Sequence, residues 1–373
     1  MNWREAFFRN CGPGLLGGIT LGQWARLLRD NWRTVHPRFW PRALLISLQS
    51  LKNSLLIGRE QRRFGAEVEK VALHPPVFVI GHWRSGTTHL HELICRDQRF
   101  AYPNLYQVSF PHTFLSTEAA DAPVIGRLLT KHRPVDNMEW SVASPQEDEL
   151  ALCALNFQSP YMNLVLPKRP DDFAKYLTFR DVPAAEVAEW RRAFEWFLKK
   201  VQWRQGRPLV LKSPTHTARI RLLLEMFPGA KFVHIHRNPY TVFQSTRQMF
   251  LKSMAWHALQ RESLHPLNAW ILRTYEEMHA AFFAEKQLIP AGQFHELGFE
   301  QLERDRVGEL RKLYEALDLP AFAEAEPGLR QYVDSLAGFK KMKHHELSPE
   351  LKAEISTRWR RNFDEWGYDR EGS

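Results

Sequence analysis

Short apolar runs alternate with helical patterns along the chain from residue 75 onward. Val77-Phe78-Val79-Ile80 is a continuous apolar run, which is typical of a strand buried on both faces. After a polar loop, residues 87–95 carry Leu90, Leu93 and Ile94 at helical spacing. This segment is therefore predicted to form a strand, a loop and a helix in succession.

The same alternation recurs toward the C-terminus. Further strands are expected at residues 209–211, 231–236 and 293–297, and helices at residues 215–227, 240–250, 266–288, 299–317 and 349–363. Strands that alternate with helices favour an α/β fold, in which helices cover both faces of a mainly parallel sheet. Ligands of such sheets bind beyond the carboxyl ends of the strands. The polar turns after the first three strands are therefore the candidate binding loops.

The first 70 residues have a different pattern of apolar and charged residues. Leucines spaced four, three and four residues apart lie among scattered basic residues, at Leu44, Leu48, Leu51 and Leu55. This spacing predicts an amphipathic basic helix, which either packs on the main domain or contacts a membrane surface or a lipid-like substrate. We expect a helical extension over residues 1–70 and a second domain over residues 71–373, with residues 40–65 as the candidate for peripheral membrane contact.

Composition narrows the class of protein. The 373 residues are 44% hydrophobic and 12% aromatic, which fits a large globular core, a cleft for an apolar acceptor, or both. Lys and Arg number 51 against 42 Asp and Glu, a net charge of +9, which suits anionic ligands. The basic residues are scattered apart from a run at residues 340–345, which either approaches a phosphate or is solvated. Nucleic acid is therefore not expected as the main partner.

Cysteines and apolar stretches bear on metal binding and location. Cys11, Cys95 and Cys153 are the three cysteines, and they lack the spacing of a zinc site, so we expect no metal and a reducing compartment. The N-terminus lacks the apolar core of a signal peptide, and charges interrupt each apolar stretch before the roughly 20 residues of a membrane span. A cytoplasmic protein is expected, with membrane association left open.

The loop after the first strand has the pattern of a phosphate-binding loop. Gly81 and Gly86 match the glycines of GxxxxGK followed by Ser or Thr, but Thr87 occupies the position of the lysine that NTPases use for a triphosphate. Backbone N–H groups and the following helix N-terminus can still hold an anion. We predict that Arg84-Ser85-Gly86-Thr87-Thr88, with His89, binds one phosphate and an adjacent transferring group without an obligatory metal. The alternative is a glycine turn with a structural role.

A second anion site is predicted where the third strand ends. Arg237 follows that strand directly, and Ser245 comes eight residues later on the next predicted helix. A guanidinium fork and a hydroxyl donor suit a phosphate monoester, although an arginine at a strand end often forms a structural ion pair instead. Together the two motifs favour a nucleotide with two separate phosphate groups.

These residues resemble the sulfotransferases that use 3′-phosphoadenosine 5′-phosphosulfate (PAPS). Residues 84–88 are similar to their 5′-phosphosulfate loop, and Arg237 with Ser245 is similar to their 3′-phosphate motif. The string GHWRSGTTHLH resembles bacterial members and the tyrosylprotein sulfotransferases, whereas cytosolic members have Lys in place of Arg84 and Trp in place of His89. The resemblance implies a P-loop-type parallel sheet flanked by helices, with PAPS as co-substrate and no required metal.

The resemblance also implies roles for charged residues. Sulfuryl transfer needs cations and donors around the sulfur, and Arg84 and Lys212 are the candidates. Resemblance to the tyrosylprotein enzymes favours Glu147 as the general base. His216 is the alternative base, because a neutral imidazole accepts a proton readily near pH 7. The acidic residues 147–149 would otherwise form a solvated helix N-terminus.

The sequence thus predicts an enzyme that moves the sulfuryl group of PAPS to an acceptor hydroxyl, on a small hydrophobic molecule such as a lipid or sterol-like alcohol. A nucleotide kinase or NTPase is one alternative. A non-catalytic module that binds a nucleotide or nucleic acid is the other.

Overall fold

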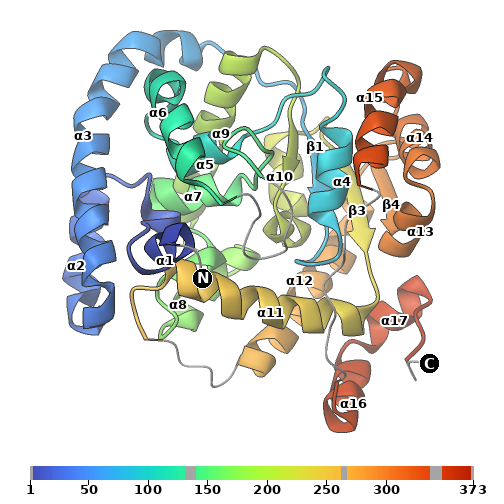
Figure 1. Cartoon of the computed structure of the whole chain (residues 1–373). Helices are drawn as coiled ribbons and strands as arrows, with labels where there is room; N and C mark the ends of the chain where they lie inside the picture. The colour runs from blue at the N-terminus through green and yellow to red at the C-terminus, as the bar shows by residue number, and fades with distance from the viewer. Residues whose placement is uncertain (1–2, 131–139, 262–266, 337–346, 371–373) are drawn as a thin grey trace. The chain divides into compact units, whose positions relative to one another are not determined.

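The computed structural model describes residues 3–130, 140–261, 267–336 and 347–370 (Figure 1). The basic run at residues 340–345 lies outside the described residues. The chain forms two compact units. The first comprises Met1–Leu73, Tyr102–Gly206 and Met249–His265, and the second comprises His74–Ala101, Arg207–Gln248 and Pro266–Ser373.

A four-stranded parallel sheet forms the centre of the second unit. Its strands are β1 (Val77–Ile80), β2 (Val210–Lys212), β3 (Lys231–His236) and β4 (Phe294–Gly298), in the spatial order β2-β1-β3-β4. β1 pairs with β2 and β3, and β3 pairs with β4, in each case in parallel. The carboxyl ends of all four strands therefore lie at one edge of the sheet.

Helices cover both faces of this sheet (Figure 1). The helices of this unit are α4 (Thr87–Ile94), α10 (Ile220–Met226), α12 (Leu267–Glu285), α13 (Phe299–Arg304), α14 (Arg306–Ala316), α15 (Phe322–Ser335), α16 (Pro349–Arg358) and α17 (Arg360–Trp366), with the 3₁₀ helices η6 (Pro214–Ala218) and η7 (Lys286–Leu288). Helix α11 (Pro239–His257) begins in this unit and continues into the first.

Successive side chains of each strand pack against helices on opposite faces of the sheet. Val77 and Val79 belong to an apolar cluster with residues of α4, α14 and α15. Phe78 points to the other face, where it contacts η6, and His234 of β3 stacks on Phe282 of α12 there. The sheet is buried on both sides, which confirms the predicted α/β fold.

The predicted elements of this unit match the structure best at the strands. β1 and β3 have the predicted bounds, and β2 and β4 are each shifted by one residue. The helix predicted at residues 299–317 is divided at Asp305, because its carboxylate caps α14 by accepting a hydrogen bond from Gly308 N at 2.8 Å. The helices predicted at residues 215–227 and 349–363 are also divided, at Arg219 and Trp359.

The described part of the first unit is helical. Its helices are α1 (Trp3–Asn10), α2 (Leu21–Asn31), α3 (Trp40–Glu69), α5 (Leu105–Ser109), α6 (Phe114–Leu128), α7 (Glu149–Asn156), α8 (Pro170–Ala174) and α9 (Ala184–Gln205), with 3₁₀ helices η1 (Gly14–Leu16), η2 (Trp32–Thr34), η3 (Pro37–Phe39), η4 (Pro160–Leu164) and η5 (Lys175–Leu177). An apolar cluster joins Trp24 of α2 to Ala154 of α7 and Met162 of η4.

The N-terminal helices pack within this unit. Helix α3 contains the predicted amphipathic helix and contacts α2, α6 and α9. The domain boundary expected after residue 70 stays a prediction. Within the described residues, no helix is both long and apolar enough to cross a bilayer.

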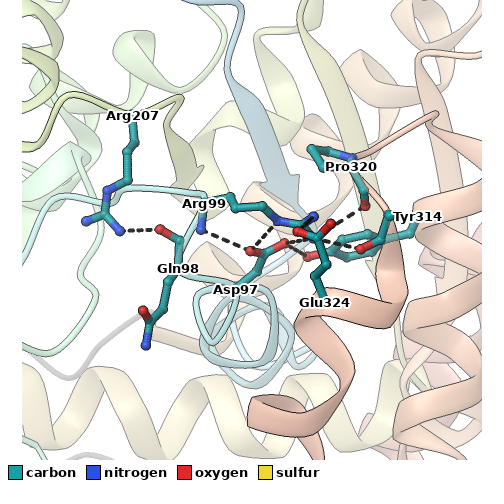
Figure 2. A network of polar contacts seen from close by, with 8 residues as sticks. Asp97, Gln98, Arg99, Arg207, Tyr314, Pro320 and Glu324 are labelled. Carbon is teal, nitrogen blue, oxygen red and sulfur yellow. Dashed lines mark hydrogen bonds and ion pairs between the residues drawn. The ribbon is translucent and has the colours of Figure 1, made fainter.

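A polar network ties the segment after α4 to helices α14 and α15 (Figure 2). Asp97 accepts hydrogen bonds from Arg99 Nε at 2.9 Å and from Tyr314 Oη at 2.9 Å. Arg99 Nη1 also lies 2.9 Å from Glu324 Oε2. Burial opposes ionisation of Asp97, but the hydrogen bonds from Arg99 and Tyr314 outweigh it and lower the pKa of the carboxyl group.

We expect Asp97→Asn to make stability less dependent on pH. Since the folded-state pKa is lowered, the Asp97 charge stabilises the fold above its unfolded pKa of about 3.9, and this contribution is lost as pH falls through the folded pKa. The wild type should exceed the variant by about 1.5–3 kcal/mol in free energy of unfolding near neutral pH. Denaturant titrations from neutral to acidic pH measure the difference, which should narrow below about pH 4.

Glu324→Gln is the matched control for this prediction. Glu324 contacts the same arginine, but its side chain is 69% exposed, so its loss should cost less than about 1 kcal/mol. A difference between wild type and Asp97→Asn that stays constant with pH would contradict the role assigned to the Asp97 charge.

Candidate phosphate-binding site

The loop between β1 and α4 depends on left-handed backbone conformations. Gly81, Arg84 and Gly86 have φ angles of 144°, 69° and 104°. A Cβ atom on Gly86 would lie 2.3 Å from the ring of Phe299, so the position requires glycine both for its backbone angle and for space. Ser85 closes the loop, because its N and Oγ both donate to the carbonyl of His82, at 3.1 and 2.6 Å.

The first turn of α4 presents its backbone to the end of the sheet. The helix starts at Thr87, directly after Gly86, and Gly86 supplies no side-chain cap. The N–H groups of a first helical turn have no partner within the helix and carry the positive end of its dipole. A phosphate or sulfate group is the type of ligand that binds such a helix end.

Two neighbouring elements hold the loop in place. Gly81 N donates to Thr217 Oγ1 of η6 at 2.7 Å. Thr246 Oγ1 of α11 donates to the carbonyl of Trp83 at 3.4 Å. The loop is thus anchored both to the segment after β2 and to the helix after β3.

The structure brings the two predicted phosphate motifs into direct contact. Arg84 Nε donates to Ser245 Oγ at 2.8 Å, and Arg237 Nη1 donates to the carbonyl of Arg84 at 3.3 Å. The guanidinium carbon of Arg237 lies 4.1 Å from the ring centroid of Phe299. Burial lowers the pKa of Arg237, although the charges of Glu300 and Glu303 oppose this shift; an arginine still remains charged at neutral pH.

Lys212 of β2 contacts Thr88 in the first turn of α4. Lys212 ends β2, which is the neighbour of β1, and its side chain is 2% exposed. Its Nζ donates to Thr88 Oγ1 at 3.4 Å. A buried ammonium group therefore contacts the first turn of α4.

His89 is oriented by a residue from much later in the chain. Arg306 Nε, at the start of α14, donates to His89 Nε2 at 3.1 Å. Neither Arg306 nor Thr217 was predicted from the sequence, because their contacts join segments that are far apart in the chain and no local motif marks them. The packing of Phe299 against Gly86 and under Arg237 was not predicted either.

The two candidate bases have different surroundings. His216 in η6 is fully buried, and its ring packs edge-on against Phe78 at a centroid distance of 5.4 Å. Glu147 belongs to the first unit, where Tyr161 Oη donates to Glu147 Oε2. Its neighbours Asp148 and Glu149 are fully buried, so the alternative of a solvated acidic helix end is wrong for both.

Comparison with known proteins gives the family. The profile of the sulfotransferase family matches residues 75–324, a range that contains β1–β4, the loop, Arg237 and Ser245. The chain belongs to the sulfotransferase family. This confirms the predicted fold and enzyme class.

Two mycobacterial sulfotransferases are similar over almost their whole length. Each is named omega-hydroxy-beta-dihydromenaquinone-9 sulfotransferase Stf3, one from Mycobacterium bovis and one from Mycobacterium tuberculosis. The sulfotransferase described here is 38% identical to each over 368 residues, covering 98% of this chain and 94% of theirs.

Solved structures of two other mycobacterial sulfotransferases share the fold. STF9 from Mycobacterium avium has a TM-score of 0.75 at 18% identity, covering 95% of this chain and 93% of its own. STF1 from Mycobacterium tuberculosis has a TM-score of 0.65 at 18% identity, covering 91% of each chain. At this level of identity the likeness concerns the fold alone.

We expect Gly86→Ala to destabilise the protein more than a glycine substitution that adds only backbone strain. Gly292→Ala is the control, because Gly292 has a φ of 79° but a Cβ added there would meet no atom within 4 Å. Both variants carry about 1–2 kcal/mol of left-handed strain, and Gly86→Ala adds overpacking of about 1–3 kcal/mol against Phe299. Denaturant unfolding measures both, and Phe299→Leu should recover part of the Gly86→Ala loss. Equal losses in the two alanine variants would show that the Phe299 contact does not constrain the loop.

Proposed function

We propose that this sulfotransferase moves the sulfuryl group of PAPS to the hydroxyl group of a hydrophobic acceptor. The observation that carries the proposal is the contact of Arg84 with Ser245 beside the first turn of α4, which has no side-chain cap. Two anion-binding motifs within one hydrogen bond of each other suit a compact nucleotide that carries two separate phosphate groups. A single triphosphate chain would not need the second motif.

We assign one set of protein groups to the 5′-phosphosulfate of PAPS and another to its 3′-phosphate. The N–H groups at the start of α4, with Thr87 and Thr88, are proposed to hold the 5′-phosphosulfate. Arg237 and Ser245 are proposed to hold the 3′-phosphate, since a guanidinium offers paired donors to phosphate oxygens. The packing of Arg237 on Phe299 supports this role, because it keeps the guanidinium plane in one orientation.

The chemistry follows from the charges around the loop. The acceptor oxygen attacks sulfur in line, the bond from sulfur to the 5′-phosphate oxygen breaks, and adenosine 3′,5′-bisphosphate leaves. Negative charge grows on the leaving oxygen, where preorganised cations and donors lower the barrier most. Arg84, Lys212 and Thr88 are the proposed groups, and the contact of Lys212 with Thr88 supports their joint action.

Glu147 is proposed to take the proton from the acceptor hydroxyl. The hydrogen bond from Tyr161 orients its carboxylate, as a general base requires. The full burial of His216 and its contact with Phe78 support a packing role for that residue, which leaves it as the second candidate.

The acceptor is proposed to be a hydrophobic alcohol of the lipid class. The two relatives at 38% identity are named for a hydroxylated menaquinone, and their similarity extends over nearly the whole chain. We propose the same class of acceptor here and a cytoplasmic site of action. A screen of a hydroxylated isoprenoid quinone, a sterol and a small phenol with labelled PAPS identifies the acceptor.

Arg237→Ala should weaken thermal protection by the bisphosphate product. Adenosine 3′,5′-bisphosphate is expected to raise the melting temperature of the wild type in the presence of a chelator. Loss of a charge-assisted contact costs about 1.5–3 kcal/mol, so affinity should fall about ten- to a hundredfold. Thermal shift and calorimetry measure this, and Arg360→Ala, which removes an arginine with a 69% exposed side chain, should bind normally. If ATP with Mg²⁺ raises the melting temperature and adenosine 3′,5′-bisphosphate does not, the proposal is wrong and an NTPase is favoured.

Glu147→Gln should lower kcat without weakening bisphosphate binding. General-base catalysis typically contributes 10²–10⁴-fold, so a loss of about that size is expected in turnover assays. Glu195→Gln, with a 49% exposed carboxylate, is the matched control and should retain full activity. If His216→Asn folds and loses activity while Glu147→Gln keeps it, the base is His216. If neither loses more than about tenfold, neither residue is the base.

A further inference from the structure

Helix α3 exposes apolar side chains and buries polar ones. It is the long blue helix beside α2 (Figure 1). The residues that it buries are Arg42, Ile46, Ser50, Asn53, Glu60 and Val68. Four of these six are polar or charged, which reverses the arrangement of an ordinary amphipathic helix packed on a core.

Buried polar contacts hold α3 in this orientation. Arg42 Nη1 donates to the carbonyl of Ala258 at 2.6 Å. Asn53 Nδ2 donates to two backbone carbonyls, each at 2.9 Å. Glu60 pairs with Lys200 at 2.5 Å, and both side chains are at most 5% exposed. Turning the helix to bury its leucines would leave these groups buried without partners or charge compensation, which is strongly unfavourable.

The outward face of α3 is a continuous apolar stripe. Its members, with exposed fractions of 64%, 64%, 59%, 45% and 72%, are Trp40, Leu44, Leu48, Leu51 and Leu55. Their spacing of three or four residues confines them to about 80° of the helix circumference, over a length of roughly 22 Å. Single exposed apolar residues are ordinary, but a contiguous stripe marks an interaction surface.

The charges around the stripe indicate the kind of partner. Between residues 31 and 66 Glu60 is the sole acidic residue, and it is buried against Lys200. The exposed charged residues of this segment are all basic: Arg33, Arg38, Lys52, Arg59, Arg62 and Arg63. Lys52 pairs with Asp121 of α6 at 2.6 Å, so the five arginines carry the positive charge of this surface. Such a surface complements anionic lipid headgroups. Trp32 and Trp40, which are 63% and 64% exposed, suit the boundary between headgroups and acyl chains.

A second copy of the chain fits this stripe less well. Arginines flank the stripe at both ends, with Arg38 before Trp40 and Arg59 and Arg62 after Leu55. Two such helices paired in either direction would bring like charges together. An anionic bilayer instead accommodates the arginines at both ends at once.

We propose that the α3 stripe, residues 40–55 with its flanking arginines, docks the enzyme on the surface of an anionic lipid bilayer. The helix lies parallel to the surface, with the leucines among the upper acyl chains and the arginines at the phosphates. The inference goes beyond the proposed sulfuryl transfer and does not depend on it, because it concerns binding by the first unit. Docking would bring the enzyme to an acceptor that resides in the bilayer.

Vesicle binding tests this proposal without donor or acceptor. The full chain should sediment with phosphatidylglycerol vesicles, bind phosphatidylcholine vesicles much more weakly, and dissociate as salt rises. The double variant Leu48→Gln/Leu55→Gln should lose about a hundredfold or more in vesicle affinity, the size expected when two leucines are no longer buried. Arg59→Gln/Arg62→Gln should lose about fivefold for each arginine removed.

Matched controls keep the test decisive. Leu288→Gln removes a 38% exposed leucine of the second unit and should bind vesicles normally. Each variant should keep the wild-type melting temperature and its shift with adenosine 3′,5′-bisphosphate, which separates failed docking from a failed donor site. Unchanged vesicle binding by the leucine variant would overturn the proposal. A wild-type dimer in sedimentation velocity that the leucine variant dissociates would also overturn it, and would assign the stripe to a second copy.

Discussion

The parallel pairing of β1 between β2 and β3 decides where the charged groups of the site lie. Since all strands run in one direction, the residues that follow them meet at one edge, whatever their separation in sequence. Lys212 reaches the phosphate loop from β2, and Arg237 reaches it from the end of β3. Concentrating cations around the positive end of α4 raises the local potential for an anionic nucleotide. The sheet buries its apolar side chains on both faces, which stabilises the strands that carry these residues.

The elements that hold α4 are as important to the loop as the sheet. Helix α4 carries the loop at its start, and the Asp97 network follows its end and joins it to α14 and α15. Helix α14 also supplies Arg306, which contacts His89 in the first turn of α4. The late helices of the chain thus position both ends of α4, although nothing in their own sequence indicates binding.

The sequence was sufficient for the strands and the loop, because each has a local signature. Phosphate binding by the two motifs stays a prediction. Apolar runs mark β1 and β2, and glycines mark the loop. Contacts such as Thr217 with Gly81 could not be predicted, since they depend on which strands are neighbours. The leucine spacing in α3 predicts the helix but not its orientation. Buried contacts of Arg42, Asn53 and Glu60 determine that orientation, and the partners of these residues lie far away in the chain.

The left-handed backbone of Arg84 shows how the loop balances two demands. Its φ of 69° is a conformation that costs a residue with a side chain about 1–2 kcal/mol relative to a right-handed one, and glycine would adopt it without strain. Glycine there would favour folding but would remove the guanidinium that contacts Ser245. Under the role proposed for Arg84 in sulfuryl transfer, the residue that relieves backbone strain at position 84 is not the residue that serves activity, as in other trade-offs between stability and activity.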